Sequence, residues 1–600
     1  MFVWTPAELN PEQESAILDP ESVFLVACPG SGKTRALTYK IAYEISRLRS
    51  DKQFVVAITY TNRAADEIHE RVELLGVDTS QLWIGTIHSF CLEWILKPYS
   101  IYHRMLRKGF RVINSHDSEN ILTELCKPYS RSHPRITYWD CGFYFTAQGY
   151  VLSCPDPSKR TTVKNILGQY FKALAGKRQI DFELILFYAS QLIDEHASIS
   201  ILLSKLFPFI LVDEYQDTKK IQYSIIACIL RAGGGSTKIF IVGDPNQAIY
   251  QSLGGFAIAA GEFRTMAGIQ LNERELSKNY RSPERIITYF GNFNVFDTTI
   301  EAASDHRNYP SLVSYNTIVT KPLLEDELIR LIRYNIETVG IRPEEVCVLA
   351  PQWVHLSSMT RKLVSSMPEY QFDGPGMVPF SRDIDNFWYK LSKIVLTSAS
   401  PEMYVRRLRW AGEVLKDLQD AGADISKWTK KSFLRECNSI KIAETDGLQY
   451  LAGFFDALFA RLGISIPATP FLMEHHKSFF ESSLTRIDRL RRDGADFIGD
   501  IGTFKRVFQE RTGITVSTIH GIKGDEYDCV IAYALLEGMV PHFNDPDGEK
   551  SAKKLLYVIC SRAKKNLHLI SERERLNGRN KEYPPTEILA TYDFDYDDVP

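Results

Sequence analysis

The chain has 600 residues, of which 44% are hydrophobic and 24% charged, and its formal net charge is −3. A single hydrophobic core does not extend over this length, so several domains are expected. The small net charge excludes a uniformly basic protein, and any nucleic-acid site must therefore be a local groove of Lys and Arg. The N-terminus lacks a signal-peptide pattern, no apolar run is long enough to span a membrane, and the ten cysteines include no Cys-x-x-Cys pair. We therefore predict a cytoplasmic protein without membrane contact, whose cysteines are buried or free thiols.

Short, continuous apolar runs alternate with helical patterns along the first part of the chain. Such runs predict a parallel sheet covered by helices on both faces. The predicted strands are Val23–Val26, Phe54–Thr59, Leu82–Ile87, Phe207–Val212 and Ile239–Val242. The predicted helices are Ala36–Leu48, Arg63–Leu75 and Ile221–Ala232. Asn62 is expected to cap the second of these helices.

Two stretches interrupt this alternation. Residues 93–180 are rich in aromatic and basic side chains and predict an inserted, mostly helical subdomain. Residues 385–505 have a helical pattern and divide a second set of strands. Those strands are predicted at Ser311–Tyr315, Val346–Leu349, Ile514–Ser517, Cys529–Ala534 and Leu567–Ile570. The last residues, Thr591–Pro600, include four aspartates and predict a disordered acidic tail.

A phosphate-binding loop is predicted between the first strand and the first helix. Residues 27–35 read Ala-Cys-Pro-Gly-Ser-Gly-Lys-Thr-Arg. Gly30 and Gly32 allow backbone N–H groups to turn toward a polyphosphate. Lys33 brings a charge to the phosphate oxygens, and the Thr34 hydroxyl can bind Mg²⁺. A fortuitous turn is the alternative, but the flanking strand and helix favour nucleoside triphosphate binding.

Two later strands end in polar residues that suit the same chemistry. Asp213 and Glu214 follow the strand that begins at Phe207. Asp213 can hold Mg²⁺ through water, and Glu214 can accept a proton from an attacking water. Gln247 follows the strand Ile239–Val242 and can orient that water. A solvated turn is the alternative at each strand end, and the upstream phosphate loop disfavours it for Asp213 and Glu214.

Arginines occur in two further segments, Asn279–Ser282 and Tyr557–Ala563. Arg281 and Arg562 could neutralise charge on a transferring phosphoryl group. Their spacing does not establish this role, since most arginines lie on protein surfaces.

In their order, these motifs resemble those of the UvrD/Rep/PcrA family of superfamily 1A DNA helicases. The resemblance covers most of residues 9–570 and is weak in 93–180 and 385–505. It implies an α/β fold of two RecA-like P-loop NTPase lobes, each interrupted by an inserted, mostly helical subdomain. The implied parts are lobe 1A (1–92 and 181–283), subdomain 1B (93–180), lobe 2A (284–384 and 506–575), subdomain 2B (385–505) and an acidic tail (576–600).

The resemblance also implies the cofactors ATP and Mg²⁺ and assigns site residues. Residues implied to bind ATP are Gln13, which would read adenine, Pro29, Gly30, Ser31, Gly32, Lys33, Thr34, Arg35, Tyr280, which would stack on adenine, and Glu526 near the ribose. Thr34 and Asp213 would hold the metal. The implied catalytic residues are Glu214, Gln247, Arg281 and Arg562. The implied DNA contacts are Tyr60, Thr61, Asn62, His88 and His520.

The function so implied is 3′–5′ movement on single-stranded or tailed duplex DNA, driven by ATP hydrolysis between the lobes. The third family motif usually contains an aromatic residue where this chain has Ser252, and a base-stacking residue is worth about 1–3 kcal/mol per base. A DNA-stimulated ATPase that senses ends or single strands and activates a partner therefore stays an alternative. A nucleotide-binding assembly module with little turnover is a third hypothesis, which the Asp213–Glu214 pair disfavours.

Chain length, sequence divergence and the absence of room for a nuclease domain after residue 570 also resemble the helicase subunit of Gabija anti-phage defence systems. That resemblance implies a nuclease-ATPase partner protein. A housekeeping repair helicase is the competing assignment.

Overall fold

The computed structural model describes residues 2–250, 254–374, 378–380, 386–492, 496–509, 513–543, 545, 547–578 and 580–600. Ser252, on which part of the functional prediction depends, lies outside these described residues. The chain forms two compact units, each built from separate stretches of sequence. Unit 1 contains Met1–Ser311 and Pro541–Ser561, and unit 2 contains Leu312–Val540 and Arg562–Pro600.

Unit 1 is built on a parallel sheet of six strands in the order β10-β1-β9-β8-β2-β3. The strands are β1 Ser22–Ala27, β2 Val55–Thr59, β3 Leu82–Thr86, β8 Phe209–Val212, β9 Lys238–Gly243 and β10 Leu271–Leu276. The five strands predicted in this part of the chain are confirmed to within two residues. The prediction for the third was wrong at its end, because Ile87 begins a helix that Thr86 caps.

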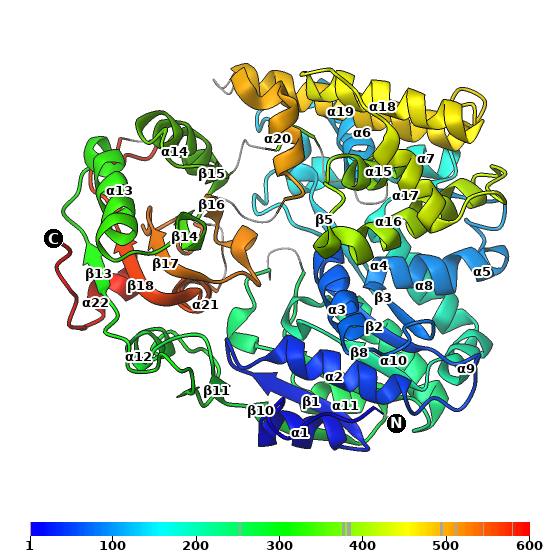
Figure 1. Cartoon of the computed structure of the whole chain (residues 1–600), viewed down its shortest axis with the longest axis horizontal. Coiled ribbons are helices and arrows are strands. Elements are labelled where there is room, and N and C mark those ends of the chain that lie inside the picture. The colour runs from blue at the N-terminus through cyan, green and yellow to red at the C-terminus, as the bar shows by residue number, and fades with distance from the viewer. Residues whose placement is uncertain are drawn as a thin grey trace. The chain divides into compact units, whose positions relative to one another are not determined.

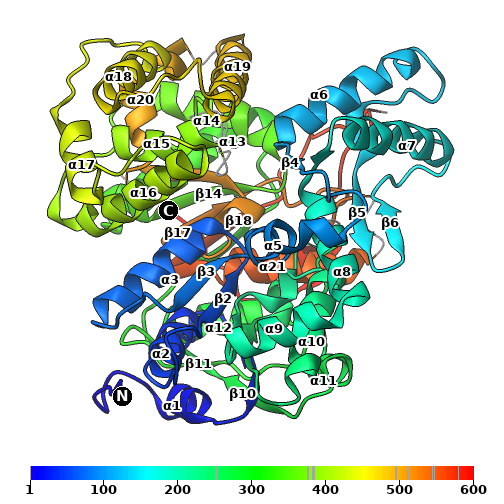
Figure 2. The ribbon, with the colours of Figure 1, turned by 90° about the vertical axis from the view of Figure 1, so that its right-hand side faces the viewer.

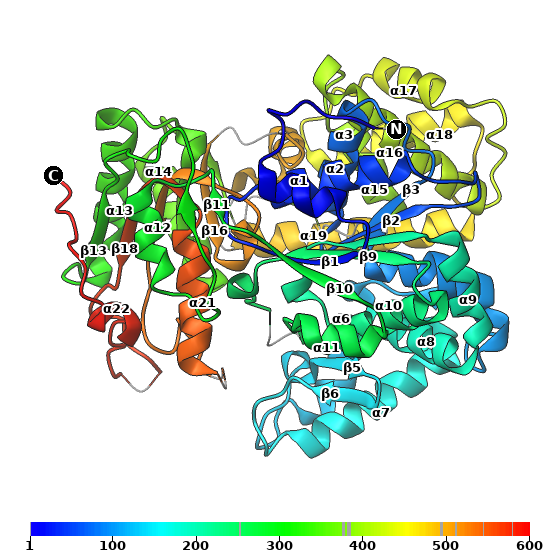
Figure 3. The ribbon, with the colours of Figure 1, turned by 90° about the horizontal axis from the view of Figure 1, so that it is seen from below.

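Helices cover both faces of this sheet, since side chains along each strand alternate between two apolar layers. Val23 and Leu25 pack with α2 and α3, whereas Phe24 packs with the helices of the opposite layer. Figure 3 shows α2 and α3 on one side of the strands and α10 and α11 on the other. These helices are α1 Pro11–Leu18, α2 Lys33–Ile45, α3 Asn62–Leu74, α8 Phe182–Glu195, α9 Ala197–Leu206, α10 Lys220–Gly233 and α11 Ala260–Ala267.

The segment inserted after β3 contains more than helices. Its elements are α4 Ile87–Phe90, α5 Lys97–Tyr99, β4 Arg111–Val112, α6 Ser115–Cys126, β5 Phe143–Thr146, β6 Gly149–Leu152, α7 Arg160–Gly176 and β7 Gln179–Ile180. Helices α6 and α7 lie side by side, and β5 and β6 form an antiparallel hairpin (Figure 2). The apolar side chains of this segment belong to the same core cluster as α8 and α10.

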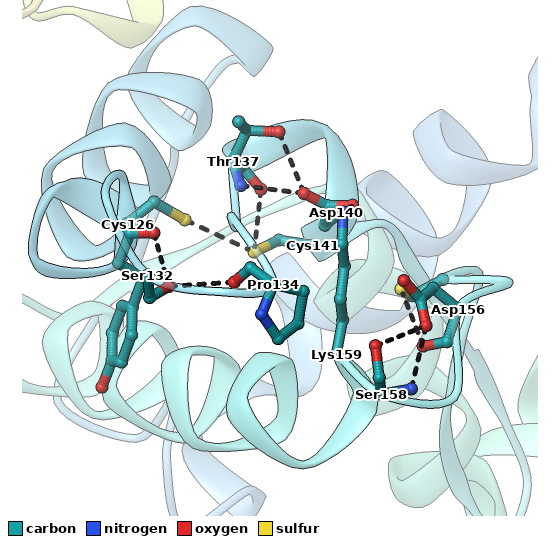
Figure 4. Close-up of polar contacts among 11 residues, drawn as sticks. Cys126, Ser132, Pro134, Thr137, Asp140, Cys141, Asp156, Ser158 and Lys159 are labelled. Atoms are coloured by element: carbon teal, nitrogen blue, oxygen red, sulfur yellow. Dashed lines mark hydrogen bonds and ion pairs between the residues drawn. The ribbon is translucent and has the colours of Figure 1, made fainter. Parts of the chain in front are cut away.

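Polar contacts hold the loop between α6 and the hairpin (Figure 4). The Asp140 carboxylate accepts hydrogen bonds from the Thr137 backbone N–H at 2.8 Å and from Lys159 Nζ at 2.8 Å. The thiols of Cys126 and Cys141 form a hydrogen bond, with their sulfur atoms 3.7 Å apart, and no disulfide. All ten cysteines are free thiols, and only Cys228 is not buried, which confirms the prediction of buried or free thiols.

Unit 1 also contains short elements beyond the sheet. They are β11 Lys278–Asn279, β12 Glu301–Ala302, α12 Glu284–Gly291 and α21 Gly548–Cys560. Asn246, which is fully buried, connects the loop after β9 to residues 295–298. Its Nδ2 donates to the carbonyl oxygen of Phe296, and its Oδ1 accepts from the backbone N–H groups of Val295 and Phe296.

Unit 2 contains a second parallel sheet, in the order β13-β18-β17-β14-β16-β15. The strands are β13 Val313–Asn316, β14 Val346–Ala350, β15 Phe372–Asp373, β16 Ile514–Thr518, β17 Tyr527–Ala532 and β18 Ala563–Ile570. Helices α13 Leu324–Arg333 and α14 Trp353–Ser366 bury their apolar sides against this sheet (Figure 1). Two parallel sheets flanked by helices confirm the predicted α/β class, and the arrangement is that of two RecA-like lobes.

A group of helices within unit 2 has its own apolar core. Trp388 is fully buried there and packs against Phe455 and Phe459. The helices are α15 Phe387–Val395, α16 Pro401–Asp420, α17 Lys430–Ser439, α18 Gly447–Leu462, α19 Pro470–Arg492 and α20 Ile501–Arg506. No helix among the described residues is both long enough and apolar enough to cross a bilayer.

The prediction of a disordered acidic tail was wrong. After α22 Glu587–Thr591, the chain returns to the edge strand β13. The Asp597 backbone N–H donates to the Val313 carbonyl at 2.9 Å, and the Asp597 carboxylate accepts from the Val313 N–H at 2.7 Å. The Tyr596 ring contacts the Tyr315 ring. The prediction from composition treated the aspartates as solvated. In the structure, Asp597 instead forms hydrogen bonds with the edge strand β13, and Tyr596 packs against Tyr315.

Candidate functional site

The phosphate loop connects the carboxyl end of β1 to the start of α2. Gly30 and Gly32 have φ values of 67° and 78°, in the left-handed region that favours glycine. A Cβ at Gly30 would lie 2.6 Å from the Arg281 Cβ, and a Cβ at Gly32 would lie 2.6 Å from the Gln13 Nε2. Gly32 caps α2 without a side chain. The N–H groups of the first turn of α2 are therefore not taken up by a capping side chain and can bind an anion.

Lys33 and Glu214 meet beside this loop. Lys33 Nζ lies 3.5 Å from both carboxylate oxygens of Glu214, and the two side chains are 13% and 22% exposed. Glu214 has a φ of 51°, which is uncommon for a residue with a side chain. This backbone conformation is imposed directly after strand β8 and turns the Glu214 carboxylate toward Lys33. Such local strain is typical of functional sites.

Asp213 is buried next to this pair. Burial and the neighbouring Glu214 carboxylate raise the pKa of Asp213, while Lys33 opposes the shift. Asp213 and Glu214 thus share one nearby lysine, and ionisation of both carboxylates would leave a net negative charge that attracts a cation. Carboxylate and hydroxyl oxygens are the ligands that Mg²⁺ prefers, and Thr34 in the first turn of α2 offers a hydroxyl. The donor set therefore fits Mg²⁺ at Thr34 and Asp213.

No cluster of three or more His, Cys, Asp or Glu side chains able to hold a metal occurs among the described residues. Mg²⁺ is commonly held by one or two carboxylates, water and substrate phosphates.

A chain of hydrogen bonds extends from Glu214 into the core. Gln216 Nε2 donates to Glu214 Oε2, and Gln216 Oε1 accepts from the Asp244 backbone N–H at 3.0 Å. The Asp244 carboxylate accepts from Gln247 Nε2 at 2.8 Å and from the Tyr557 hydroxyl at 3.3 Å. Gln247 therefore lies in the same network as Glu214, as part of a support for the loops after β8 and β9. Sequence reasoning did not assign Gln216, Asp244 or Tyr557 to the site.

Arg281 belongs to unit 1, and its Nη1 donates to the Ser561 carbonyl at 2.9 Å. Its Cβ faces Gly30, so the residue lies beside the phosphate loop. Arg562, Glu526 and His520 belong to unit 2. There the buried Arg562 donates through Nη1 to the Asp525 carbonyl at 3.3 Å, while Glu526 and His520 are exposed. Unit 1 by itself thus brings together Lys33, Thr34, Asp213, Glu214, Gln247 and Arg281.

The residues predicted to contact the base also lie close to the phosphate loop. Tyr280 is 44% exposed, and its hydroxyl accepts from Asn10 Nδ2 at 2.9 Å. Gln13 is only 4% exposed, and its Nε2 donates to the Ser31 carbonyl. Arg35 is exposed and lies 5.9 Å from the centre of the Tyr39 ring.

The predicted DNA contacts of unit 1 lie at the carboxyl ends of β2 and β3. Tyr60 is 41% exposed, and its ring centre lies 5.1 Å from that of Tyr250. The His88 ring packs against Phe182, and burial together with Lys219 lowers the pKa of His88 to about 4, so the ring is neutral near pH 7. Aromatic rings with a nearby cation suit the stacking of unpaired bases.

The prediction that Asn62 caps α3 was wrong. Thr61 is the cap, since its hydroxyl accepts from the Ala64 N–H at 3.2 Å, and Asn62 is the first helical residue. An extended Thr61 leaves its Oγ free to reach the third amide of the helix, and the extended strand β2 ends two residues before it.

Two protein families match this chain. Residues 9–256 match the UvrD/REP helicase N-terminal domain, and residues 503–574 match the UvrD-like helicase C-terminal domain. The chain belongs to the UvrD-like DNA helicases of superfamily 1A. The N-terminal match contains the phosphate loop, Asp213, Glu214 and Gln247, and the C-terminal match contains Glu526 and Arg562.

Individual relatives are similar over different shares of the chain. A probable DNA helicase II homolog from Rickettsia conorii is 25% identical over 94% of this chain and 93% of its own length. The ATP-dependent DNA helicase PcrA of Bacillus subtilis is 28% identical over 46% of this chain and 38% of its own length. DNA helicase II of Escherichia coli is 30% identical over 47% of this chain and 39% of its own length. The alignments to the last two therefore span less than half of those proteins.

Proposed function

We propose that this protein is an ATP-dependent DNA helicase that moves 3′ to 5′ on single-stranded DNA and uses Mg²⁺ as cofactor. The observation that carries the proposal is the meeting of Lys33, Asp213 and Glu214 beside a glycine loop at the start of α2. Membership in the UvrD-like DNA helicases supports it. The names of the relatives, which include ATP-dependent DNA helicase PcrA, support the same reaction and substrate.

Each residue of unit 1 would then have a role in phosphoryl transfer. Lys33 and the amides of the first turn of α2 would bind the phosphates, with Thr34 and Asp213 binding Mg²⁺, which supplies charge neutralisation at the transferring group. Glu214 would accept a proton from the attacking water, and Gln247 would help to orient that water. Arg281 and Arg562 would stabilise the developing negative charge.

The DNA strand would contact Tyr60, Thr61, Asn62, His88 and His520. The exposed Tyr60 ring, with Tyr250 beside it, supports stacking on bases. Thr61 and Asn62 would present the first turn of α3 to a phosphate, because amides at a helix start attract anions. We propose the division into lobes 1A and 2A with inserted subdomains 1B and 2B as the frame for this movement.

The test is strand displacement on duplexes that carry either a 3′ or a 5′ single-stranded tail. We expect displacement of the 3′-tailed duplex with ATP, and none from the 5′-tailed one. Lys33→Ala should abolish displacement, whereas Lys52→Ala, at an exposed lysine away from the loop, should not change it. DNA-stimulated ATP hydrolysis without displacement would favour the sensing function that Ser252 keeps open. Absence of hydrolysis under all conditions would contradict the proposal.

We further propose that the protein acts in anti-phage defence beside a nuclease-ATPase partner. It depends on the resemblance to the helicase subunit of Gabija systems. Co-purification of a nuclease with the chain expressed from its own gene neighbourhood is the supporting result, and a neighbourhood of repair genes without a nuclease would favour the housekeeping assignment.

A further inference from the structure

The hairpin of the inserted segment directs one tyrosine away from the apolar core. Strand β5 lies beside α8 (Figure 2). Its residue Phe145 is 5% exposed, and the Phe145 ring stacks on that of Phe187 with 4.3 Å between the ring centres. Because successive side chains of a strand point to opposite faces, the Tyr144 side chain points away from this core.

The Tyr144 ring lies against Gly254, in the segment that follows β9. A Cβ at Gly254 would lie 3.1 Å from Tyr144 Cδ2 and 3.2 Å from Tyr144 Cγ. Gly254 also has a φ of 89°, in the left-handed region that favours glycine. Any larger residue at this position would therefore displace the ring. The Tyr144 side chain itself remains partly exposed.

A carboxylate ties the hairpin to the same segment. Glu183, in the first turn of α8, accepts from the Phe145 backbone N–H at 3.1 Å through Oε2 and from Lys219 Nζ through Oε1. Lys219 in turn pairs with Gly255 in an antiparallel bridge. The place of Tyr144 beside this segment is therefore held by a second set of contacts.

Two further tyrosine rings meet near this point. The ring centres of Tyr60 and Tyr250 lie 5.1 Å apart. The Gly255 backbone N–H donates to the Tyr250 carbonyl at 3.0 Å, and a Cβ at Gly255 would lie 3.4 Å from the Tyr250 Cβ, so the chain after Tyr250 folds back on it. The residues between Tyr250 and Gly254 are Gln-Ser-Leu and supply no ring. The third aromatic side chain at this loop therefore comes from the inserted hairpin.

The charges around these rings suit the faces of bases better than phosphates. Burial, together with the Asp217 and Glu214 carboxylates, raises the pKa of Tyr250 to about 12, and burial with Asp217 also raises the pKa of Tyr60. Both phenols are therefore protonated at pH 7, and their rings are uncharged. The same carboxylates repel a phosphate, whereas a base has an uncharged face that can stack on an aromatic ring.

We infer that Tyr144 is a DNA-binding residue, whose ring stacks on an unpaired base of the strand that contacts Tyr60. This inference rests on the proposed function and names a contact within it that the sequence did not predict. The inserted segment thereby supplies a stacking ring to a chain that has Ser252 in the loop after β9.

The test compares two single strands of equal length. One is a thymidine oligonucleotide, and the other consists wholly of abasic residues, so that it has phosphates but no bases. Tyr144→Leu removes the aromatic face and keeps apolar bulk, whereas Tyr144→Phe keeps the ring. Tyr102→Leu is the matched control, because Tyr102 is a 61% exposed ring of the same inserted segment that contacts His196 instead. Binding is measured by fluorescence anisotropy with the full chain, and the thermal unfolding midpoint is measured on each preparation.

We expect Tyr144→Leu to bind the thymidine strand about fivefold to a hundredfold more weakly, which is what one base–aromatic stack contributes. Its affinity for the abasic strand should equal that of the wild type. Tyr144→Phe and Tyr102→Leu should bind both strands as the wild type does. Unchanged binding of the thymidine strand by Tyr144→Leu would overturn the inference, as would an equal loss of affinity for both strands.

A second measurement decides the matter if the abasic strand binds too weakly to compare. Stacking quenches the fluorescence of 2-aminopurine, placed in turn at each position of the thymidine strand. At one position the quenching should be lost in Tyr144→Leu and retained in Tyr144→Phe, and an unchanged pattern in Tyr144→Leu would contradict the inference. Failure of the proposed function is separate, because the wild type would then neither bind single-stranded DNA nor hydrolyse ATP.

Discussion

Gln216 offers a direct way to perturb Glu214 without touching it. Gln216 is 1% exposed, and its Nε2 donates to the Glu214 carboxylate while its Oε1 accepts from the Asp244 N–H. Gln216→Glu retains the acceptor and the shape but places a second carboxylate against Glu214. A hydrogen bond to a charged group contributes about 1.5–3 kcal/mol. Loss of that contribution from the positioning of Glu214 predicts a kcat for ATP hydrolysis that is about tenfold to a hundredfold lower.

The assay is phosphate release at saturating ATP and single-stranded DNA, with the thermal unfolding midpoint measured on the same preparations. Gln222→Glu is the matched control, because Gln222 is 7% exposed and its Oε1 accepts from the Lys219 N–H at 2.8 Å, in a capping box on α10 away from Glu214. We expect the control to retain its kcat. A Gln216→Glu protein that is folded and hydrolyses ATP within twofold of the wild-type rate would refute the reasoning.

Three further predictions concern stability. Asn246→Ala leaves the N–H groups of Val295 and Phe296 without their acceptor and opens space at a fully buried side chain. We expect urea unfolding to give a free energy of unfolding about 2–4 kcal/mol lower, and an unchanged midpoint would contradict this. Burial lowers the pKa of His568 to about 3 in the folded state, whereas the ordinary histidine pKa is 6.5. Unfolding therefore takes up a proton between pH 6.5 and 3, and the free energy of unfolding should decrease as the pH falls through this range. The contribution of this residue is at most about 1.4 kcal/mol per pH unit. His568→Gln should flatten that part of the stability profile. Asp597→Ala removes the carboxylate that accepts from the Val313 N–H, so hydrogen exchange at the Val313 amide should become faster. Unchanged protection of this amide would show that the tail does not cover β13.

The elements that the sequence predicted well depend on local pattern. Strands β1, β2, β8, β9 and β14 are nearly continuous runs of buried apolar residues, and such runs are visible without any knowledge of partners. The edge strand β10, which reads LNEREL and exposes four residues, was not predicted because it lacks this pattern. The phosphate loop from Gly30 to Thr34 was also predicted, because its glycines and its lysine lie next to one another in the sequence.

The remaining features depend on contacts between distant residues. The Tyr557 hydroxyl reaches Asp244 across 313 residues, and nothing in either local segment indicates the other. Gln13 Nε2 likewise donates to the Ser31 carbonyl, 18 residues away, a contact that only the fold creates. The acidic tail was predicted to be disordered from its composition. Composition does not reveal that Asp597 accepts a hydrogen bond from Val313 on the edge strand β13.

The most direct test of the central claim is the rate of ATP hydrolysis by the wild type and by Glu214→Gln, each with and without single-stranded DNA. The account predicts hydrolysis that DNA stimulates in the wild type, and at least a hundredfold loss in Glu214→Gln, which should still bind ATP and DNA. Substantial hydrolysis by Glu214→Gln, or a wild-type rate indifferent to DNA, would contradict it.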